Sequence, residues 1–105
     1  MGDACHPMLP DVAQGAAQAI EDAGVLACAL SLTEDLDGAL AVYERVRKDR
    51  AERIQKSATV TRKALHLPDG EEQRKRDEAI RGPGKNPDLW ADHDWQDFMW
   101  GELKR

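Results

Sequence analysis

Residues 1–30 read MGDACHPMLPDVAQGAAQAIEDAGVLACAL, and this stretch decides what the rest of the chain can be. A Gly-Asp pair comes first, a segment with Pro7 and Pro10 follows, and an alanine-rich run begins near Ala13. Glycine lets another group approach the backbone closely, and a long run of small and apolar residues without breakers is typical of a helix. The stretch therefore predicts the end of a strand, then a turn, then a helix that runs to about Leu32.

The start of this helix has the chemistry of a binding site. The Asp3 carboxylate can accept a hydrogen bond from a ligand hydroxyl, and a helix that begins near Gln14-Gly15 leaves backbone N–H groups unpaired. These groups and the helix dipole favour negative charge just outside the helix. Gly-Asp is nevertheless a common dipeptide, and a proline-shaped turn with a solvated Asp3 explains the same residues. Spacing alone favours this plainer interpretation.

Apolar residues recur at helical spacing along most of the chain. A polar break at Thr33-Glu34-Asp35 provides caps for a second helix, with Asp37 as a further candidate. A bend is expected near Asp49, and Pro68 and Gly82 bound a last, mostly charged helix over residues 70–81. The expected apolar stripes are Ala16, Ala19, Ile20, Ala23, Leu26, Cys28, Ala29 and Leu30; then Leu36, Leu40, Tyr43 and Val46; then Ile54, Ala58, Thr61 and Leu65.

The predicted fold class is mainly α, with at most one strand at the N-terminus, because no strand pattern follows the first residues. Helices of this kind would leave apolar faces uncovered, which favours a segment of a larger fold. The tail is expected to pack against the rest of that fold through Trp90, Trp95, Phe98, Met99 and Trp100.

Composition narrows the function classes. The chain has 105 residues, is 33% charged and carries a formal net charge of −5, which argues against nucleic acid or an anionic membrane as a partner. No apolar run approaches the ~20 residues that a membrane span needs. Cys5 and Cys28 form neither a disulfide framework nor a metal-ligand spacing. These features predict a soluble, cytoplasmic protein.

Two further patterns are interpreted as structural. His6 follows Cys5, but adjacent side chains in a strand point apart and no third ligand is spaced to join them, so no metal site is predicted. His93 lies between two aspartates and is interpreted as a solvated loop residue. A basic run is interpreted as a solvated helix face rather than a nucleic-acid site because acidic residues interrupt it; its members are Arg45, Arg47, Lys48, Arg50, Arg53 and Lys56.

The opening run resembles the second flavin-binding motif of the FAD-dependent aromatic-ring monooxygenases, which include salicylate hydroxylase and para-hydroxybenzoate hydroxylase. Many residue types fall at fixed offsets over the stretch. Later segments, "ALAVYERVRKDRAERIQKSA", "HLPDGEEQRKRDEAI" and "WQDFMWG", resemble later parts of the same family, and the salicylate hydroxylase-like branch is the most similar. The matching motif residues are Gly2, Asp3, Ala4, His6, Pro7, Pro10, Gln14, Gly15, Ala19, Ile20, Glu21, Asp22 and Ala23.

The resemblance implies the C-terminal helical segment of an α/β FAD-binding fold of the glutathione reductase and para-hydroxybenzoate hydroxylase type. It implies that Asp3, next to Gly2, accepts a hydrogen bond from the ribityl chain of FAD and that Pro10 lies against the isoalloxazine ring. Backbone amides around Gln14, Gly15 and Ala16 would face the pyrimidine end of the flavin. The family uses NAD(P)H as co-substrate and hydroxylates aromatic small molecules. No catalytic residue is predicted in this chain.

The chain also departs from the family pattern. Asp11 and Ala17 stand where relatives often carry other residue types, and the sequence has no Gly-x-Gly-x-x-Gly, the signature of the dinucleotide-binding unit. We expect residues 1–105 to form one C-terminal part of a monooxygenase domain. Its parts are the flavin motif and helix (1–32), a helical hairpin (33–67), and a peripheral helix with an aromatic tail (68–105). A truncated segment, inactive alone, is the leading hypothesis. The alternatives are a non-catalytic helical interaction module that uses its apolar faces to dimerise or to bind a partner, and half of a split enzyme that assembles with a partner.

Overall fold

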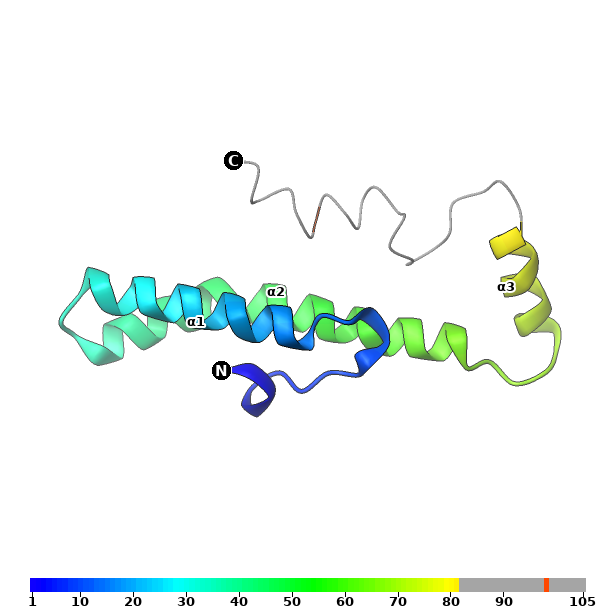
Figure 1. The fold of residues 1–105 in the computed structure, drawn as a ribbon, viewed down its shortest axis with the longest axis horizontal. Coiled ribbons are helices and arrows are strands. Elements are labelled where there is room, and N and C mark those ends of the chain that lie inside the picture. Colours follow the sequence, from blue (N-terminus) through cyan, green and yellow to red (C-terminus); the bar gives the residue numbers. More distant parts are fainter. Residues whose placement is uncertain (82–97, 99–105) are drawn as a thin grey trace. The chain divides into compact units, whose positions relative to one another are not determined.

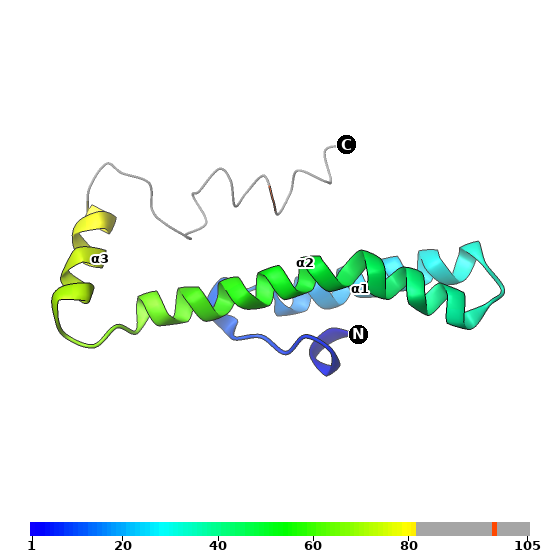
Figure 2. The same cartoon turned by 180° about the vertical axis from the view of Figure 1, so that it is seen from behind.

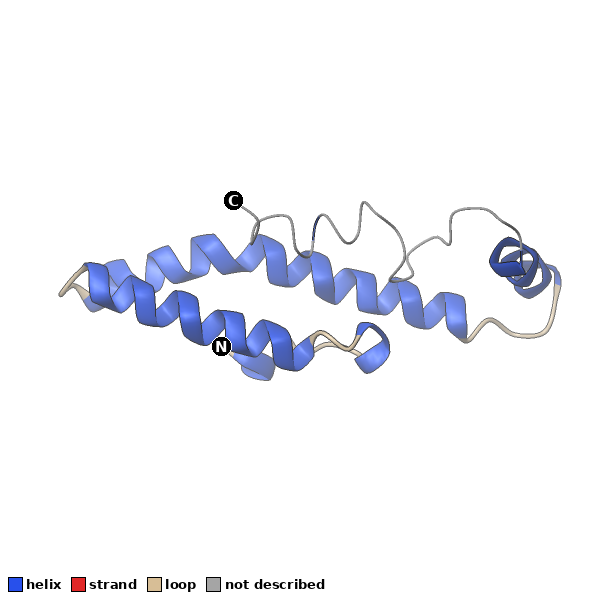
Figure 3. Cartoon of the chain, turned by 45° about the horizontal axis from the view of Figure 1, so that its top comes forward, coloured by secondary structure: helices blue, strands red, loops and turns tan. Residues whose placement is uncertain are grey.

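A computed structural model describes residues 1–81 and residue 98, and every regular element in these residues is a helix (Figures 1 and 3). Two short 3-10 helices, η1 (Gly2–Ala4) and η2 (Pro10–Val12), precede α1 (Gly15–Leu32), α2 (Leu36–Leu65) and α3 (Glu71–Arg81). The chain divides into two compact units, Met1–Val60 and Thr61–Arg105. The predicted mainly α class is confirmed.

The expected strand at Gly2-Asp3 does not form. Gly2 has a φ of +61°, and the backbone N–H groups of Cys5 and His6 both donate to its carbonyl oxygen at 3.0 Å, which closes a tight turn. A strand needs a neighbour to pair its backbone groups, and residues 1–81 contain no other strand that would serve. Asp3 therefore lies in a single helical turn rather than at a strand end.

Helices α1 and α2 run antiparallel, side by side, along residues 15–60 (Figures 1 and 2). The turn between them is capped as the sequence predicts. The N–H of Gly38 donates to Oδ2 of Asp35 at 3.1 Å, and the N–H of Asp35 donates to Oγ1 of Thr33 at 3.1 Å. Asp35 thus satisfies an amide in the first turn of α2, whereas Asp37 lies inside the helix.

Helix α2 continues without a break through Asp49, so the predicted bend is wrong. Its second apolar stripe is confirmed in part, because Ile54, Ala58 and Thr61 are buried while Leu65 is exposed. The first stripe is wrong: its aliphatic members Leu36, Leu40 and Val46 are exposed, and the buried residues in that half of the helix are Ala39, Arg47 and Ala51. Small side chains at the contact allow the two helices to approach closely.

The inward face of α1 is also different from the predicted one. Its buried residues are Gln18, Asp22 and Ala29, whereas Ile20 is 73% exposed. Ala29 confirms one member of the predicted apolar stripe, but in the first half of the helix the polar residues Gln18 and Asp22 are buried in place of Ile20. The reason is that Arg47 of α2 supplies hydrogen-bonding partners for both of these polar side chains.

The second unit contains the end of α2 and the charged helix α3, which has no buried residue. Nη1 of Arg76 donates to the carbonyl oxygens of Ala64 at 2.7 Å and Leu65 at 3.1 Å, so an arginine of α3 satisfies carbonyls at the C-terminal end of α2. The three tryptophans and Met99 of the predicted aromatic cluster lie outside the described residues. None of the helices in the described ranges is long and apolar enough to cross a membrane.

Candidate functional site

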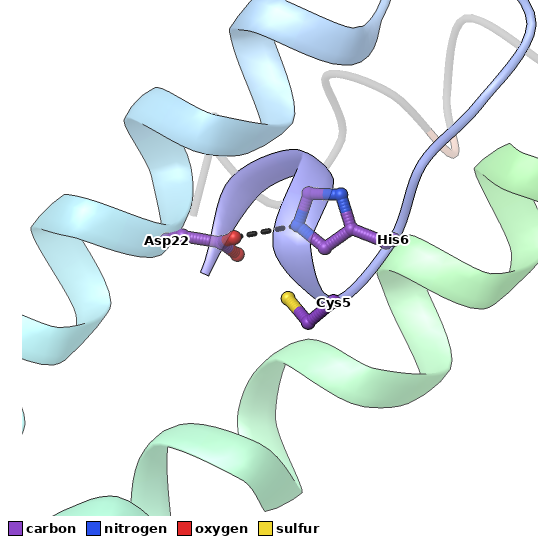
Figure 4. A group of neighbouring side chains, drawn as sticks. All are labelled: Cys5, His6 and Asp22. Carbon is purple, nitrogen blue, oxygen red and sulfur yellow. Dashed lines mark hydrogen bonds and ion pairs between the residues drawn. The ribbon is translucent and has the colours of Figure 1, made fainter.

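A fully buried carboxylate, Asp22 of α1, joins three segments of the chain. Its Oδ2 accepts a hydrogen bond from the backbone N–H of Gly2 at 2.8 Å and lies 2.5 Å from Nε2 of His6 (Figure 4). Its Oδ1 accepts a hydrogen bond from Nε of Arg47 on α2 at 2.8 Å. The carboxylate therefore ties the N-terminal segment, α1 and α2 together through contacts between residues 16 to 25 positions apart.

Arg47 is buried, and the two terminal nitrogens of its guanidinium also hydrogen-bond to residues of α1. Nη1 donates to Oε2 of Glu21 at 2.6 Å, and Nη2 donates to Oε1 of Gln18 at 2.6 Å and to the Gln18 carbonyl oxygen at 3.3 Å. A planar guanidinium with five N–H donors suits such an arrangement, and a lysine would not reproduce it. A buried charge is tolerated only when it is paired and hydrogen-bonded in this way.

Glu21 has a second arginine partner at the edge of the same network. Nε and Nη2 of Arg50 donate to its two carboxylate oxygens at 2.7 Å and 2.9 Å, a two-point contact. The hydrogen bond from Arg50 is the main reason why the pKa of Glu21 lies below its ordinary value. Burial by itself would raise the pKa of Asp22, but hydrogen bonds from Arg47, the Gly2 amide and His6 outweigh it and lower the pKa to about 2. Both carboxylates are therefore ionised at neutral pH.

The interpretation of the basic run as a solvated helix face is correct for some members and wrong for two. Lys48 and Lys56 are exposed and pair with glutamates four residues earlier on α2. Arg47 and Arg50 instead face α1, with side chains only 5% and 15% exposed. Charge composition alone could not distinguish the buried arginines from the exposed lysines, because it does not show which helix faces each side chain.

The reasons given against a metal site at His6 are partly overturned. Because residues 2–4 form a 3-10 turn and not a strand, Cys5 and His6 do not point apart, and ligand atoms of Cys5, His6 and Asp22 lie within 4.8 Å of one another (Figure 4). The hydrogen bonds from Gly2 and Arg47, with the His6 contact, already engage both oxygens of Asp22. That no metal binds here stays a prediction.

A groove of about 570 Å³ opens beside this cluster. Tyr43 lines it, and burial, together with the neighbouring Cys5 and Asp22, raises the pKa of the Tyr43 hydroxyl to about 12. Sγ of Cys5 lies 3.9 Å from that hydroxyl. Both polar and apolar side chains border the groove: Cys5, His6, Leu40, Tyr43, Glu44, Arg47, Lys48, Ala51, Glu52 and Gln55.

The candidate site residues from the sequence fall into two groups. Gly2 is buried and Asp3 is exposed, both in η1, and the bond from Gly2 to Asp22 holds this turn against α1. Pro10 opens η2, and Gln14, Gly15 and Ala16 form the start of α1. The first group contacts α1 at Asp22, and the second group lies in η2 and at the start of α1.

The N-terminal end of α1 has features that suit a polar ligand. No side chain caps it, so the first backbone amides of the helix stay open. Oε1 of Gln14 is buried and has no hydrogen-bond partner among the described residues. Ala13, just before it, has a φ of +52°, a conformation that a residue other than glycine rarely adopts. Open donors, an unpaired acceptor and local strain occur together at the helix start, which the family resemblance predicts to face the pyrimidine end of the flavin.

Sequence reasoning missed the partners of Glu21 and Asp22. A usable signal was present: two adjacent carboxylates on an otherwise small and apolar helix need compensation, and α2 offers Arg47 and Arg50 one turn apart. The spacing alone does not say that the two helices are antiparallel neighbours, which is the information the fold supplies.

Comparison with known proteins shows the family to which this chain belongs. A family described as "FAD binding domain" matches residues 1–58, more than half of the chain, and the chain belongs to this family. It is 46% identical over 95 residues to the FAD-dependent monooxygenase atnJ of Arthrinium sp, a match that covers 85% of this chain and 23% of that protein. It is 45% identical over 80 residues to the 3-amino-4-hydroxybenzoate 2-monooxygenase PtmB3 of Streptomyces platensis, covering 75% and 20% of the two chains.

A third relative, 6-hydroxynicotinate 3-monooxygenase of Bordetella bronchiseptica, is 50% identical over 58 residues, which cover 53% of this chain and 15% of that protein. The chain thus spans about a fifth of the length of the curated relatives it matches. No solved structure gives a significant match. The chain is a segment of the FAD-dependent monooxygenase family.

Proposed function

We propose that this chain supplies the flavin-ring side of the FAD site of an aromatic-ring monooxygenase. In this proposal the Asp3 carboxylate accepts a hydrogen bond from the ribityl chain, and Pro10 lies against the ring. The open amides of Gly15 and Ala16 bind the pyrimidine end, where Gln14 offers an unpaired acceptor. The observation that carries the proposal is the uncapped start of α1 beside this buried, unpaired oxygen.

The residues present fit that part of the cofactor. Preorganised backbone amides at a helix start stabilise negative charge on a neighbouring ligand, and a buried acceptor without a partner is costly unless a donor such as a ring N–H satisfies it. FAD, when bound, would supply the redox chemistry of hydroxylation, with NAD(P)H as the co-substrate and an aromatic small molecule as the substrate. The residues of this chain would bind and orient the ring.

The adenosine half of the cofactor has no counterpart in this sequence, which lacks Gly-x-Gly-x-x-Gly. We therefore expect the isolated chain to bind FAD and FMN with similar affinity, because both present the same ring and ribityl chain. Isotope-labelled chain titrated with each flavin should show backbone shifts at Gly15 and Ala16. The two affinities should agree within about three-fold, since only interactions specific to one ligand separate affinities.

A matched pair of substitutions tests the role of the carboxylate. Asp3→Asn removes a charge-assisted acceptor and should weaken FMN binding by about ten-fold, the effect of losing one such bond. Asp37→Asn makes the same change on the exposed start of α2 and should leave FMN binding unchanged. Absence of shifts at the start of α1 for either flavin would contradict the proposal, as would FAD binding much tighter than FMN binding.

A second candidate function has an observation of its own. Large apolar side chains are exposed along α1 and α2, among them Ile20 at 73%, Leu32 at 81% and Leu36 at 60%. Apolar side chains left exposed in such number are typical of faces that another protein surface covers, so a helical interaction module is the alternative. Sedimentation distinguishes the two: a discrete, well-folded oligomer that binds no flavin favours the interaction module.

A further inference from the structure

We infer that Asp22 is the positioning residue of the proposed flavin site, because it holds the backbone of Gly2-Asp3 against α1 at a fixed point along the helix. This inference rests on the proposed function. Asp22 does not itself contact the cofactor in this scheme; it acts through the Gly2 amide, whose N–H it accepts at 2.8 Å.

The contact fixes the residue that carries the ligand-binding carboxylate. Gly2 immediately precedes Asp3, and its positive φ of +61° sets the direction in which the chain enters the turn. A methyl group at Gly2 would lie 3.6 Å from the side chain of Ala19, so the turn is packed directly on α1. One hydrogen bond and one close approach together leave the Gly2-Asp3 backbone little freedom to shift along the helix.

Contacts with several residues fix the side chain of Asp22 in place. Arg47 on α2 binds one oxygen, while His6 and the Gly2 amide contact the other. Tyr43 on α2 is close enough for the charge of Asp22 to contribute to the raised pKa of its hydroxyl. Because the side chain is fully buried and both oxygens are engaged, it cannot adopt another rotamer without leaving several polar groups unpaired. Such packing is what a positioning residue requires.

The position of Asp22 along α1 sets the spacing of the site. Gly15 begins the helix and Asp22 lies two turns further on, which corresponds to about 10 Å along the helix axis at 1.5 Å per residue. The Gly2-Asp3 turn and the open amides at Gly15 are thereby held at a constant separation. A ligand that contacts both, through a chain of hydroxyls at one end and a ring at the other, needs this constancy.

The adjacent carboxylate of Glu21 provides a matched control for substitution of Asp22. Glu21 also binds Arg47, at 2.6 Å, and binds Arg50 in addition. It joins α1 to α2, as Asp22 does, and among the described residues its hydrogen bonds go to Gln18, Arg47 and Arg50 and not to the N-terminal segment. Substitution of Glu21 therefore weakens the helical hairpin without releasing Gly2, whereas substitution of Asp22 does both.

The test compares Asp22→Asn with Glu21→Gln in the full chain. For each variant, circular dichroism measures helix content, amide exchange of Gly2 reports its hydrogen bond, and the shifts of Gly15 and Ala16 give the FMN affinity. We expect Asp22→Asn to speed Gly2 exchange and weaken FMN binding by about ten-fold each, the effect of losing one hydrogen bond to a charged group. Glu21→Gln should change FMN affinity by less than about two-fold, since it leaves that bond intact.

The outcomes separate the two claims. If the wild-type chain produces no FMN shifts, the proposed function fails and this inference fails with it. If the wild-type chain binds FMN and both variants bind it equally, Asp22 has no positioning role while the proposed function stands. If Asp22→Asn does not fold, an ester in place of the Met1–Gly2 peptide bond takes its place, because it removes the N–H that Asp22 accepts and leaves every side chain unchanged. An unchanged FMN affinity in this ester variant would then overturn the inference.

Discussion

Arg47 and Asp22 form a buried ion pair across the two long helices, with Nε of the guanidinium 2.8 Å from Oδ1 of the carboxylate. The side chains are 5% and 0% exposed, so neither charge has access to water that would replace its partner. The inner face of this helical hairpin therefore combines this polar pair with buried apolar residues such as Ile54 and Ala58, and removal of either partner would leave the other charge buried and unpaired.

Removal of the Arg47 guanidinium should destabilise the fold severely. In Arg47→Met, Asp22 loses a buried counter-charge and Gln18 loses its side-chain partner, and breaking a buried pair in this way costs about 3–5 kcal/mol. Urea unfolding followed by circular dichroism measures the loss. Lys48→Ala, the adjacent position, removes a pair with Glu44 in which both side chains are more than half exposed, and it should cost less than about 0.5 kcal/mol. Equal losses in the two variants would contradict the buried-pair account.

Stability should fall in acid because of Asp22. The pKa of Asp22 is lowered in the folded chain from an ordinary 3.8 to about 2. The ionised carboxylate therefore stabilises the folded chain fully above about pH 5, and this stabilisation is lost as the pH falls from there towards the folded-state pKa. The full effect is about 2 kcal/mol. The groups that face the carboxylate are Arg47, His6, Tyr43 and the Gly2 amide.

Urea midpoints measured from pH 7 to pH 2 test this dependence. The wild-type midpoint should be level near neutrality and decline below about pH 4, where the unfolded chain begins to bind the proton first. Glu21 adds to the decline in the same direction, since its pKa is also lowered. Asp22→Asn should be less stable at neutral pH and should decline less steeply in acid. Parallel declines in the two proteins would show that Asp22 is not the group involved.

Two glycines in residues 1–30 should respond to alanine in opposite directions. Gly2 has a φ of +61°, where a side chain is strained by about 1–2 kcal/mol, so Gly2→Ala should destabilise the chain. Gly24 lies inside α1, where an added methyl group would meet open space, and Gly24→Ala should stabilise by about 0.5–1 kcal/mol through helix propensity. Thermal melts measure both. A stable Gly2→Ala chain would mean that the N-terminal turn is not held as described.

Much of the fold could be predicted from local patterns. The alanine-rich run, the caps at Thr33 and Asp35, and the charged helix before Gly82 are short-range signals, and each led to the right element. The N-terminal strand was wrong because a strand depends on a distant neighbour that residues 1–81 do not contain. The bend at Asp49 was wrong because one polar residue does not interrupt a helix, and α2 runs unbroken from Leu36 to Leu65.

The polar interior could not be predicted from periodicity. Hydrophobic spacing placed Ile20 inside, but the chain buries Asp22 and exposes Ile20. Only the antiparallel placement of α2 brings Arg47 to that carboxylate. The candidate flavin residues, in contrast, came from the family resemblance, and their roles stay predictions that binding experiments must test.

The central claim is that these residues form the ring side of a flavin site, and a transplant tests it most directly. The aligned segment of the Arthrinium monooxygenase, which is 46% identical, would be replaced by the matching residues of this chain, and the FAD content of the purified protein measured. The account predicts about one FAD for each folded chimera, as expected when a family motif keeps its binding geometry, and a marked loss of FAD when Asp3→Asn is added. A folded chimera that neither retains FAD nor takes it up when it is supplied would contradict the account.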